Sequence, residues 1–518
     1  MKLNSLFRKM FYFDHEEPVH NHKETPAPHL SLEDLDCSKL KELFRYSLDV
    51  KIHSYYTIND GDTPNPIIIY CDGMIDSKQM NDFLYRQLEK LLTLHPFVGN
   101  GTQPGIPLLN QNIRQIKEPN AIDTLIGEVL SGNLVLYFEE SRQIYTIPMA
   151  KPPQREPSES NTEISVKGPR DGFTESIETN VALIRKRLRT TTLGVENLEI
   201  GTRSRTKIAL LYITDITNKS LLQEARNRLQ KINVDSILSS QQLEEGLSDS
   251  SYSMFPLLEY MGRPDFIAES LLRGRFAIVV DGSPMVIIGP TNLMSLIKTP
   301  EDLHLPFHYV SLERLLRIVG LIVSIFLPGF WVSISAFNLD QIPFPLLATV
   351  VMSRLGLPLS GPLDLFLMIG LFELFREAGM RLPKAVGQTV AVVGGLIVGE
   401  AAISAGITGP TSLVVSAVTA VATFTLVNQS LSGTVTVLRF FVLSLCCLFG
   451  MLGFFLSMFL LVVYLSSLTS FGIPFLSPLS PIRFRDVIYS LIELPWKLNK
   501  KRAEMYAPQD TNRQGENS

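Results

Sequence analysis

The chain has 518 residues, with 47 basic and 51 acidic side chains and a formal charge of −4. This length allows two or more structural units, and the balanced charge excludes a general electrostatic attraction to nucleic acid. Only ten of the 98 charged side chains fall between residues 318 and 482, which excludes a single soluble globular domain.

The N-terminal segment, residues 1–30, contains four of the eight histidines and three prolines. The histidine spacing does not indicate a metal site, so the composition favours disorder. The segment also lacks the apolar core and the cleavage site of a signal peptide. The four cysteines indicate no disulfide framework, because two stand alone and the Cys446–Cys447 pair lies in an apolar stretch. We therefore expect an intracellular N-terminal region without a metal or a cofactor.

Two stretches of the soluble half follow the same plan of elements. Each begins with a buried strand and an amphipathic helix, and continues with a helix ended by glycine and a strand hairpin. In the first stretch these elements are expected at 65–73, 76–92, 121–132 and 133–149. In the second stretch they are expected at 206–215, 218–232, 264–274 and 275–290. The repeated order predicts two related α/β subdomains.

The sequence therefore predicts an α+β soluble N-terminal region of two related α/β subdomains, followed by an all-α polytopic membrane domain. The expected soluble units are a disordered segment (1–30), the first subdomain (31–150), a flexible Pro- and Ser-rich linker (151–165), and a signature helix with the second subdomain (166–310). They are followed by a membrane domain of about four to six helices (311–482) and a cytoplasmic tail (483–518).

The stretch VKGPRDGFTESIETNVALIRKR, residues 166–187, places glycines and charges before a basic helix. It lacks the GxxxxGK(S/T) spacing of a P-loop, and no apolar strand directly precedes it. The helix has an apolar face made by Ile177, Val181 and Ile184. We therefore interpret its basic residues as a solvated face or a contact with another subunit, rather than as a nucleic-acid site. These residues are Arg185, Lys186, Arg187 and Arg189.

Three stretches resemble signatures of the GerA-type spore germinant receptor A subunits, the family of the GerA, GerB and GerK A subunits and of SpoVAF-like relatives. They are residues 166–190, residues 371–410 (LFELFREAGMRLPKAVGQTVAVVGGLIVGEAAISAGITGP) and residues 471–481 (FGIPFLSPLSP). The resemblance extends from about Leu32 to about Trp496. It implies a protein of the spore inner membrane with a cytoplasmic N-terminal region of two related subdomains. It also implies a transporter-like B subunit and a lipoprotein C subunit as partners.

The resemblance further implies that the signature residues form a subunit or subdomain interface and not a catalytic loop. These residues are Lys167, Gly168, Pro169, Arg170, Asp171 and Gly172. A positive φ is expected at Gly172, where valine would be strained. Changes in this stretch are therefore expected to impair assembly of the complex rather than any catalysis.

Five apolar stretches are expected to span the membrane. Arg314 and Arg317 precede the first stretch, and further basic residues follow Arg483, so the positive-inside rule places both ends of the chain in the cytoplasm. Both ends on one side require an even number of crossings. The extra pass could come from 341–353 or from 471–481, or one of the five could be re-entrant. The five stretches are 315–337, 360–379, 386–405, 411–430 and 438–466.

Glu400 is the isolated acid of the apolar stretch GGLIVGEAAISAG. A carboxylate in the bilayer is costly, so Glu400 is a candidate for an ion pathway. It could equally pair with a basic residue on a neighbouring helix or lie near the membrane interface. Glu373, Arg376 and Glu377 are expected to form ion pairs, within one helix or between helices, near the inner surface. Asp364 and Arg439 could snorkel to the membrane interface.

The leading hypothesis is a non-enzymatic membrane subunit of a germination receptor complex that self-associates and conducts ions. The alternatives are a SpoVAF-like amplifier that does not sense nutrients, and a secondary transporter of small nutrients. The spans contain no evident inverted repeat, which disfavours a transporter. The sequence has no His–Glu metal motif, nucleophile elbow or P-loop, which disfavours an enzyme. Besides the B and C subunits, the expected partners are membrane lipid and further copies of the chain, but not nucleic acid.

Overall fold

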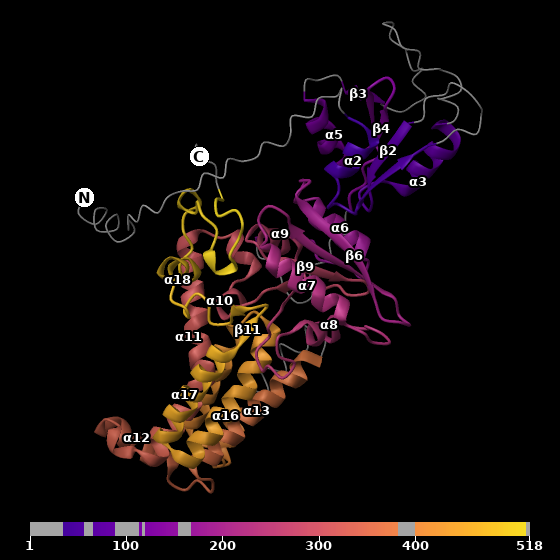
Figure 1. The fold of residues 1–518 in the computed structure, drawn as a ribbon. Helices are drawn as coiled ribbons and strands as arrows, with labels where there is room; N and C mark the ends of the chain where they lie inside the picture. The colour runs from indigo at the N-terminus through magenta and orange to yellow at the C-terminus, as the bar shows by residue number, and fades with distance from the viewer. Residues whose placement is uncertain are drawn as a thin grey trace, which may run out of the picture.

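The computed structural model describes residues 35–55, 66–88, 113–116, 120–153, 167–381 and 399–513. Two α/β units come first in the chain, and a set of long helices extends from the second unit (Figure 1). The predicted disordered segment, most of the predicted linker and most of the predicted span 386–405 lie outside the described residues. The fold class predicted from the sequence is confirmed.

The first α/β unit contains a five-stranded antiparallel sheet in the order β1-β2-β4-β5-β3. Its two central strands, β2 and β4, are almost wholly buried, which explains their continuous apolar runs. The strands are β1 (Val50–Ser54), β2 (Pro66–Cys71), β3 (Arg114–Ile116), β4 (Leu134–Phe138) and β5 (Gln143–Ile147).

The second α/β unit contains a sheet with the same topology, in the order β6-β7-β9-β10-β8, again antiparallel throughout. Strand for strand it matches the first sheet, so the duplication predicted from the element order is confirmed. The outer strands β1 and β6, and the short strands β3 and β8, were not predicted. The strands are β6 (Leu193–Ile200), β7 (Thr206–Ile213), β8 (Glu259–Met261), β9 (Phe276–Val280) and β10 (Val286–Gly289).

Alternate strand residues point to opposite faces of each sheet, and both faces are apolar. Helices therefore cover both faces. In β7, Ala209, Leu211 and Ile213 pack with α6 and α9, whereas Ile208, Leu210 and Tyr212 pack with α7 and α8. The first unit repeats this arrangement, with α2 and α5 on one face and α3 and η2 on the other. The helices are α2 (Cys37–Leu43), α3 (Ser77–Asp82), the π-helix η2 (Phe83–Leu88), α5 (Ala121–Leu130), α6 (Ile177–Arg185), α7 (Lys219–Lys231), α8 (Ser240–Leu247) and α9 (Pro264–Leu272).

The helical region follows two short elements, α10 (Leu293–Leu296) and η3 (Pro300–Leu303). Two of the described helical segments, Phe307–Phe337 and Gln429–Phe449, are long and apolar enough to cross a membrane. Three further apolar helices, α12, α15 and α17, are shorter. The elements are α11 (Phe307–Val332), η4 (Ser333–Phe337), η5 (Leu339–Gln341), α12 (Phe344–Arg354), α13 (Gly361–Arg381), α15 (Pro410–Phe424), α16 (Gln429–Phe449) and α17 (Met451–Ser467).

The prediction of one span over 438–466 is wrong, because the chain turns back at Gly450. This glycine has a φ of 57°, and a Cβ there would lie 2.8 Å from the Phe337 ring. Its carbonyl accepts a hydrogen bond from Ser333 Oγ at 3.0 Å. Helices α16 and α17 therefore form a hairpin that packs against the end of α11. The predicted span 411–430 is also shortened, because α15 ends at Phe424.

After α17 the chain returns to the second α/β unit and ends on it. The elements of this C-terminal tail are β11 (Thr469–Ser470), β12 (Ile473–Pro474), α18 (Phe484–Leu491), η6 (Trp496–Leu498) and η7 (Glu504–Tyr506). Near the end of the tail, the Gln509 backbone N–H donates to the Ile216 carbonyl at 2.8 Å, and Arg513 pairs with Glu269 at 2.7 Å. The tail and the second unit therefore lie on the same side of the helical region.

Candidate functional site

The signature stretch, Lys167–Gly172, lies between the second α/β unit and the segment that leads into α11. The Lys167 backbone N–H donates to Oε2 of Glu301 in η3 at 3.1 Å. Gly168 is closely surrounded, since a Cβ there would lie 2.2 Å from Nη2 of Arg263 and 2.7 Å from Cδ2 of His304. Asp171 accepts two hydrogen bonds from Nη2 of Arg187, at 2.7 and 2.6 Å. The stretch is thus an interface between parts of one chain.

Two expectations for the signature stretch need correction. Gly172 is buried, but in the described part of the chain the glycines with a positive φ do not include it. The steric requirement for glycine lies instead at Gly168, where neighbouring side chains leave no room for a Cβ. Two of the four basic residues that follow do not belong to a solvated face, because Arg185 is fully buried and Arg187 pairs with Asp171. Lys186 is partly exposed and Arg189 is exposed, as expected for a solvated face. The apolar face predicted for this helix does pack into the core of the second unit.

Arg185, the last residue of α6, joins the two α/β units. Its Nε and Nη2 donate to the two carboxylate oxygens of Asp49, just before β1, at 2.7 and 2.6 Å. A second contact lies beside this pair, where the Val195 backbone N–H donates to the Tyr46 carbonyl at 2.8 Å. The bidentate pair is buried on both sides, so it fixes the relative position of the units.

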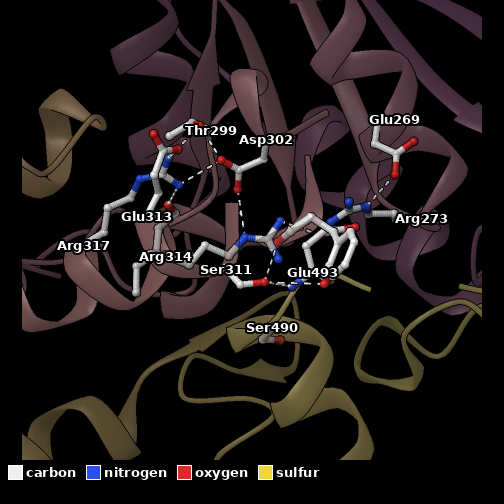
Figure 2. A network of polar contacts seen from close by, with 12 residues as sticks. Glu269, Arg273, Thr299, Asp302, Ser311, Glu313, Arg314, Arg317, Ser490 and Glu493 are labelled. Carbon is white, nitrogen blue, oxygen red and sulfur yellow. Dashed lines mark hydrogen bonds and ion pairs between the residues drawn. The ribbon is translucent and has the colours of Figure 1, made fainter. Parts of the chain in front are cut away.

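A buried charged network connects η3 to the beginning of α11 (Figure 2). Arg314 donates from Nε to Oδ2 of Asp302 at 2.8 Å, and Arg317 donates from Nη1 to Oδ1 of the same carboxylate at 3.0 Å. Burial raises the pKa of Asp302, but the two guanidiniums outweigh burial and hold the pKa below its ordinary value. The carboxylate is therefore charged at neutral pH and fastens η3 to α11.

Glu493 adds the C-terminal tail to this junction network. Its carboxylate lies 2.7 Å from Nη2 of Arg314, and its backbone N–H donates to Oγ of Ser311 at 3.1 Å. The sequence presents Arg314 only as a topology signal. Its carboxylate partners were missed, because they come from η3 and from the tail, and no sequence pattern pairs them.

The stretch after α17 forms a second connection, which we call the docking loop, residues 469–475. Asp249 accepts hydrogen bonds from Oγ1 of Thr469 at 2.6 Å and from the Phe471 backbone N–H at 3.0 Å. The guanidinium of Arg228 lies 4.3 Å from the centre of the Phe471 ring, which also packs edge-on against Phe276 of β9. The docking loop thus inserts an aromatic ring into the core of the second unit and attaches α17 to it.

The helical region buries a charged cluster between α11, α13, α15 and α16. Arg439 donates from Nε to the Ser324 carbonyl at 2.8 Å, bonds Oγ1 of Thr423, and lies 3.8 Å from Glu373. Glu373 also pairs with Arg376 within α13, as expected. The expectation that Arg439 snorkels is wrong, because the side chain is buried among these helices. Four helices therefore meet around one guanidinium.

Two further acids of the helical region, Asp364 and Glu400, have different surroundings. Asp364 is buried, contrary to the expectation that it snorkels, and its carboxylate accepts a hydrogen bond from the Gly409 backbone N–H at 3.4 Å. Glu400 lies on a helical turn, residues 399–404, and is exposed in the single chain. Its neighbour Gly399 faces Leu413 of α15. Among the described residues Glu400 has no ion-pair or hydrogen-bond partner for its side chain.

Within the described ranges, no group of three or more His, Cys, Asp or Glu side chains is placed to hold a metal ion. The functional features are therefore connections and buried charges: the signature stretch, the junction network, the docking loop and the buried cluster around Arg439.

Comparison with known proteins identifies one family. The model described as "Bacillus/Clostridium GerA spore germination protein" matches residues 38–505. The chain is 39% identical over 485 residues to spore germination protein XA of Bacillus anthracis, which covers 93% of this chain and 97% of that protein. It is 33% identical over 461 residues to spore germination protein KA of Bacillus subtilis strain 168, covering 88% of this chain and 84% of that protein.

Similarity also extends to a membrane protein and to a solved structure. The chain is 32% identical to the uncharacterized membrane protein YfkQ of Bacillus subtilis strain 168, over 85% of each chain. The crystal structure of the N-terminal domain of the A subunit of the Bacillus megaterium spore germinant receptor GerK3 matches with a TM-score of 0.37 and 27% identity. That match covers 49% of this chain and 92% of the solved chain.

Proposed function

The chain belongs to the GerA family of spore germination proteins, and from that membership we propose that it is a membrane subunit of a germinant receptor complex. In this role it helps convert nutrient sensing into the release of ions. It acts as an oligomeric ion channel, together with a transporter-like B subunit and a lipoprotein C subunit. It has no catalytic function.

The observation that carries this proposal is the double attachment of the second α/β unit to the helices. The junction network holds the beginning of α11, and the docking loop holds the end of α17. Both attachments contain buried ion pairs or buried aromatic rings, which resist independent movement of the parts they join. A displacement of the α/β units on binding a partner would therefore be passed to two membrane helices.

The proposed orientation places the α/β units and the C-terminal tail in the cytoplasm, which in a spore is the core. Arg314 and Arg317 at the beginning of α11 support this orientation by the positive-inside rule. The tail packs on the second α/β unit through Gln509 and Arg513, which supports placing both on one side of the membrane. The membrane domain then crosses the spore inner membrane several times.

The ion pathway is proposed to lie where copies of the chain meet. Glu400 supports this proposal, because its carboxylate is exposed in the single chain and has no partner among the described residues. A ring of such carboxylates from several subunits attracts cations. The buried cluster around Arg439 is placed between the helices that would have to move when the pathway opens.

The test is to purify the chain in detergent, alone and with candidate B and C subunits, and to measure the mass of each assembly. The same samples are then reconstituted in vesicles, and cation currents are recorded with and without nutrients. An oligomer that carries nutrient-dependent currents in the presence of the B subunit is expected. A monomer without currents in any combination would refute the proposal. Currents that never respond to nutrients would instead favour a SpoVAF-like amplifier, and substrate uptake without channel currents would favour a transporter.

A further inference from the structure

A basic cavity lies where the second α/β unit, the beginning of α11 and the C-terminal tail meet. Its volume is about 210 Å³, and a smaller cavity of about 50 Å³ adjoins it and shares part of its lining. Three carboxylates line the two cavities, namely Glu269, Asp302 and Glu493. They face twice as many cationic side chains, which are Arg273, Lys298, Arg314, Lys501, Arg502 and Arg513.

The three carboxylates are all engaged by arginines. Glu269 pairs with Arg273 at 2.9 Å and with Arg513 at 2.7 Å. The other two belong to the junction network, where Asp302 and Glu493 both pair with Arg314. The acids in the lining therefore neutralise arginines and leave a surplus of positive charge.

Two cationic donors of the cavity lack an acceptor. The Lys298 ammonium makes no hydrogen bond and no ion pair with the described residues, although it lines both cavities. Nη1 of Arg314 is buried without a hydrogen-bond partner, in a side chain that is only 2% exposed. An unsatisfied buried donor on a charged group is costly, so Nη1 of Arg314 needs an acceptor, either a water of the cavity or a ligand.

The charges around Lys298 also favour an anion in the cavity. Burial lowers its pKa well below the ordinary value, and the nearby guanidiniums of Arg273 and Arg314 lower it further. Glu493 and Asp302 oppose this shift only in part. An anion in the cavity would offset the repulsion between these cations and favour the charged lysine.

We propose that this cavity binds an oxyanion, such as a phosphate, sulfate or carboxylate group, through Lys298 and Nη1 of Arg314. Asn499, which lines both cavities, provides a further amide donor. The ligand would contact α9, the beginning of α11 and the tail at once, so it would strengthen the attachment of the α/β unit to the membrane helices. This inference rests on the geometry of the cavity and not on the proposed function.

The phosphate could come from solution or from a lipid headgroup, because the chemistry is the same. The lining includes Leu303 and Phe307, whose apolar side chains are partly exposed where α11 begins, at the level expected for headgroups. The experiment therefore needs one arm without anionic lipid and one arm with it.

The first arm uses the full chain in a neutral detergent and titrates sulfate while thermal unfolding is followed. Sulfate is chosen because its charge is constant over the range in which Lys298 titrates. We expect sulfate to raise the melting temperature, and Lys298→Met to weaken the apparent affinity about tenfold, the usual effect of losing one charge-assisted hydrogen bond. The affinity of the parent should also fall as pH rises through the lowered pKa of Lys298.

Two further variants test whether sulfate binding depends on the charge of this cavity. Asn499→Asp leaves Lys298 in place but adds a carboxylate to the cavity wall, and it should also weaken sulfate binding. Lys219→Met removes an exposed lysine at the start of α7 and should leave binding unchanged. Equal sulfate protection in the parent, Lys298→Met and Asn499→Asp would overturn the proposal.

The second arm compares lipid nanodiscs of phosphatidylcholine alone with nanodiscs that also contain phosphatidylglycerol. If the ligand is a headgroup, phosphatidylglycerol should remove the sulfate effect in the parent and co-purify with it, but less with Lys298→Met. If the ligand is soluble, the sulfate effect should persist in both lipids. If neither lipid retention nor sulfate protection depends on Lys298, the cavity binds no oxyanion.

Discussion

The guanidinium of Arg314 and the carboxylate of Asp302 lie 2.8 Å apart, both buried, at the point where the second α/β unit meets α11. Arg317 shares the same carboxylate. One acid therefore bridges two guanidiniums of α11, which also pair with Glu493 and Glu313, and the position of α11 relative to η3 depends on it.

Asp302→Asn should destabilise this junction strongly. The change leaves Arg317 and Arg314 buried with less compensation, and removing one partner of a buried pair costs about 3–5 kcal/mol. We expect a lower melting temperature in detergent and slower germination in spores that carry the variant. Unchanged stability would show that the network does not hold the junction.

Asp235→Asn provides the matched control for this variant. Asp235 pairs with Arg203 at 3.6 Å, and both side chains are largely exposed, so the change should cost about 0–1 kcal/mol. The pH dependence gives a second check. Because the folded-state pKa of Asp302 is lowered, its stabilisation is present above the unfolded value and is lost as pH falls through the folded value. Asp302→Asn should remove that part of the acid destabilisation.

Arg185→Met should loosen the contact between the two α/β units. It leaves Asp49 buried without its bidentate partner, and the buried Cys71 thiol lies 3.5 Å from Oδ2 of that carboxylate. Burial and the nearby Asp49 carboxylate raise the pKa of Cys71, which keeps the thiol unreactive in the parent. We expect its modification, mapped by mass spectrometry, to become about tenfold faster or more. Arg203→Met at the exposed pair is the control. Equal rates of Cys71 modification in both variants would show that the Arg185–Asp49 pair does not hold the two α/β units together.

Gly168→Ala should disturb the signature stretch although it adds a single methyl group. The new Cβ would lie 2.2 Å from Arg263 and 2.7 Å from His304, so the stretch or these two ion-paired side chains must shift. We expect weaker assembly with the partner subunits, measured by co-purification. Gly127→Ala in α5 is the control, because its Cβ meets nothing within 4 Å and helical alanine is favoured by about 0.5–1 kcal/mol. Assembly that is equally good in both variants would show that the packing around Gly168 does not support assembly with the partner subunits.

Much of the fold could be predicted because its signals are local. The strand and helix periods of the two α/β units are visible in short windows, and their repetition revealed the duplication. The turn at Gly450 was missed, because a continuous apolar run looks the same whether one helix or a tight hairpin crosses it. The Arg185–Asp49 pair joins residues 136 positions apart, and only tertiary packing brings them together. The sequence thus located the signature motif, but it could not show the contacts between residues far apart in the chain.

The orientation of the chain is testable with a cysteine label. Lys219→Cys places a thiol at an exposed position of the second α/β unit. If this unit is cytoplasmic, a membrane-impermeant maleimide should label the position only after intact protoplasts are opened. Labelling before opening would place the unit outside and reverse the proposed topology.

Glu400→Gln tests the proposed ion pathway. An isolated carboxylate at the centre of a bilayer costs at least about 2.5 kcal/mol by insertion scales unless it faces water or a partner. The described residues offer Glu400 no partner, and its side chain is exposed in the single chain. Glutamine keeps the size and hydrogen-bonding capacity of glutamate but removes the charge. The variant should therefore accumulate in the membrane with its partners, while cation conductance falls or changes selectivity.

The outcome for Glu400→Gln separates a conducting role from a structural one. Asp340→Asn is the control, because Asp340 is an exposed acid beyond the end of α11 and its loss should leave conductance unchanged. If Glu400→Gln conducts and supports germination like the parent, Glu400 is not part of the pathway. If the variant protein instead disappears from the membrane, the carboxylate stabilises a contact between subunits. The pathway would then have to be sought near Arg439, where four helices already meet around a buried charge.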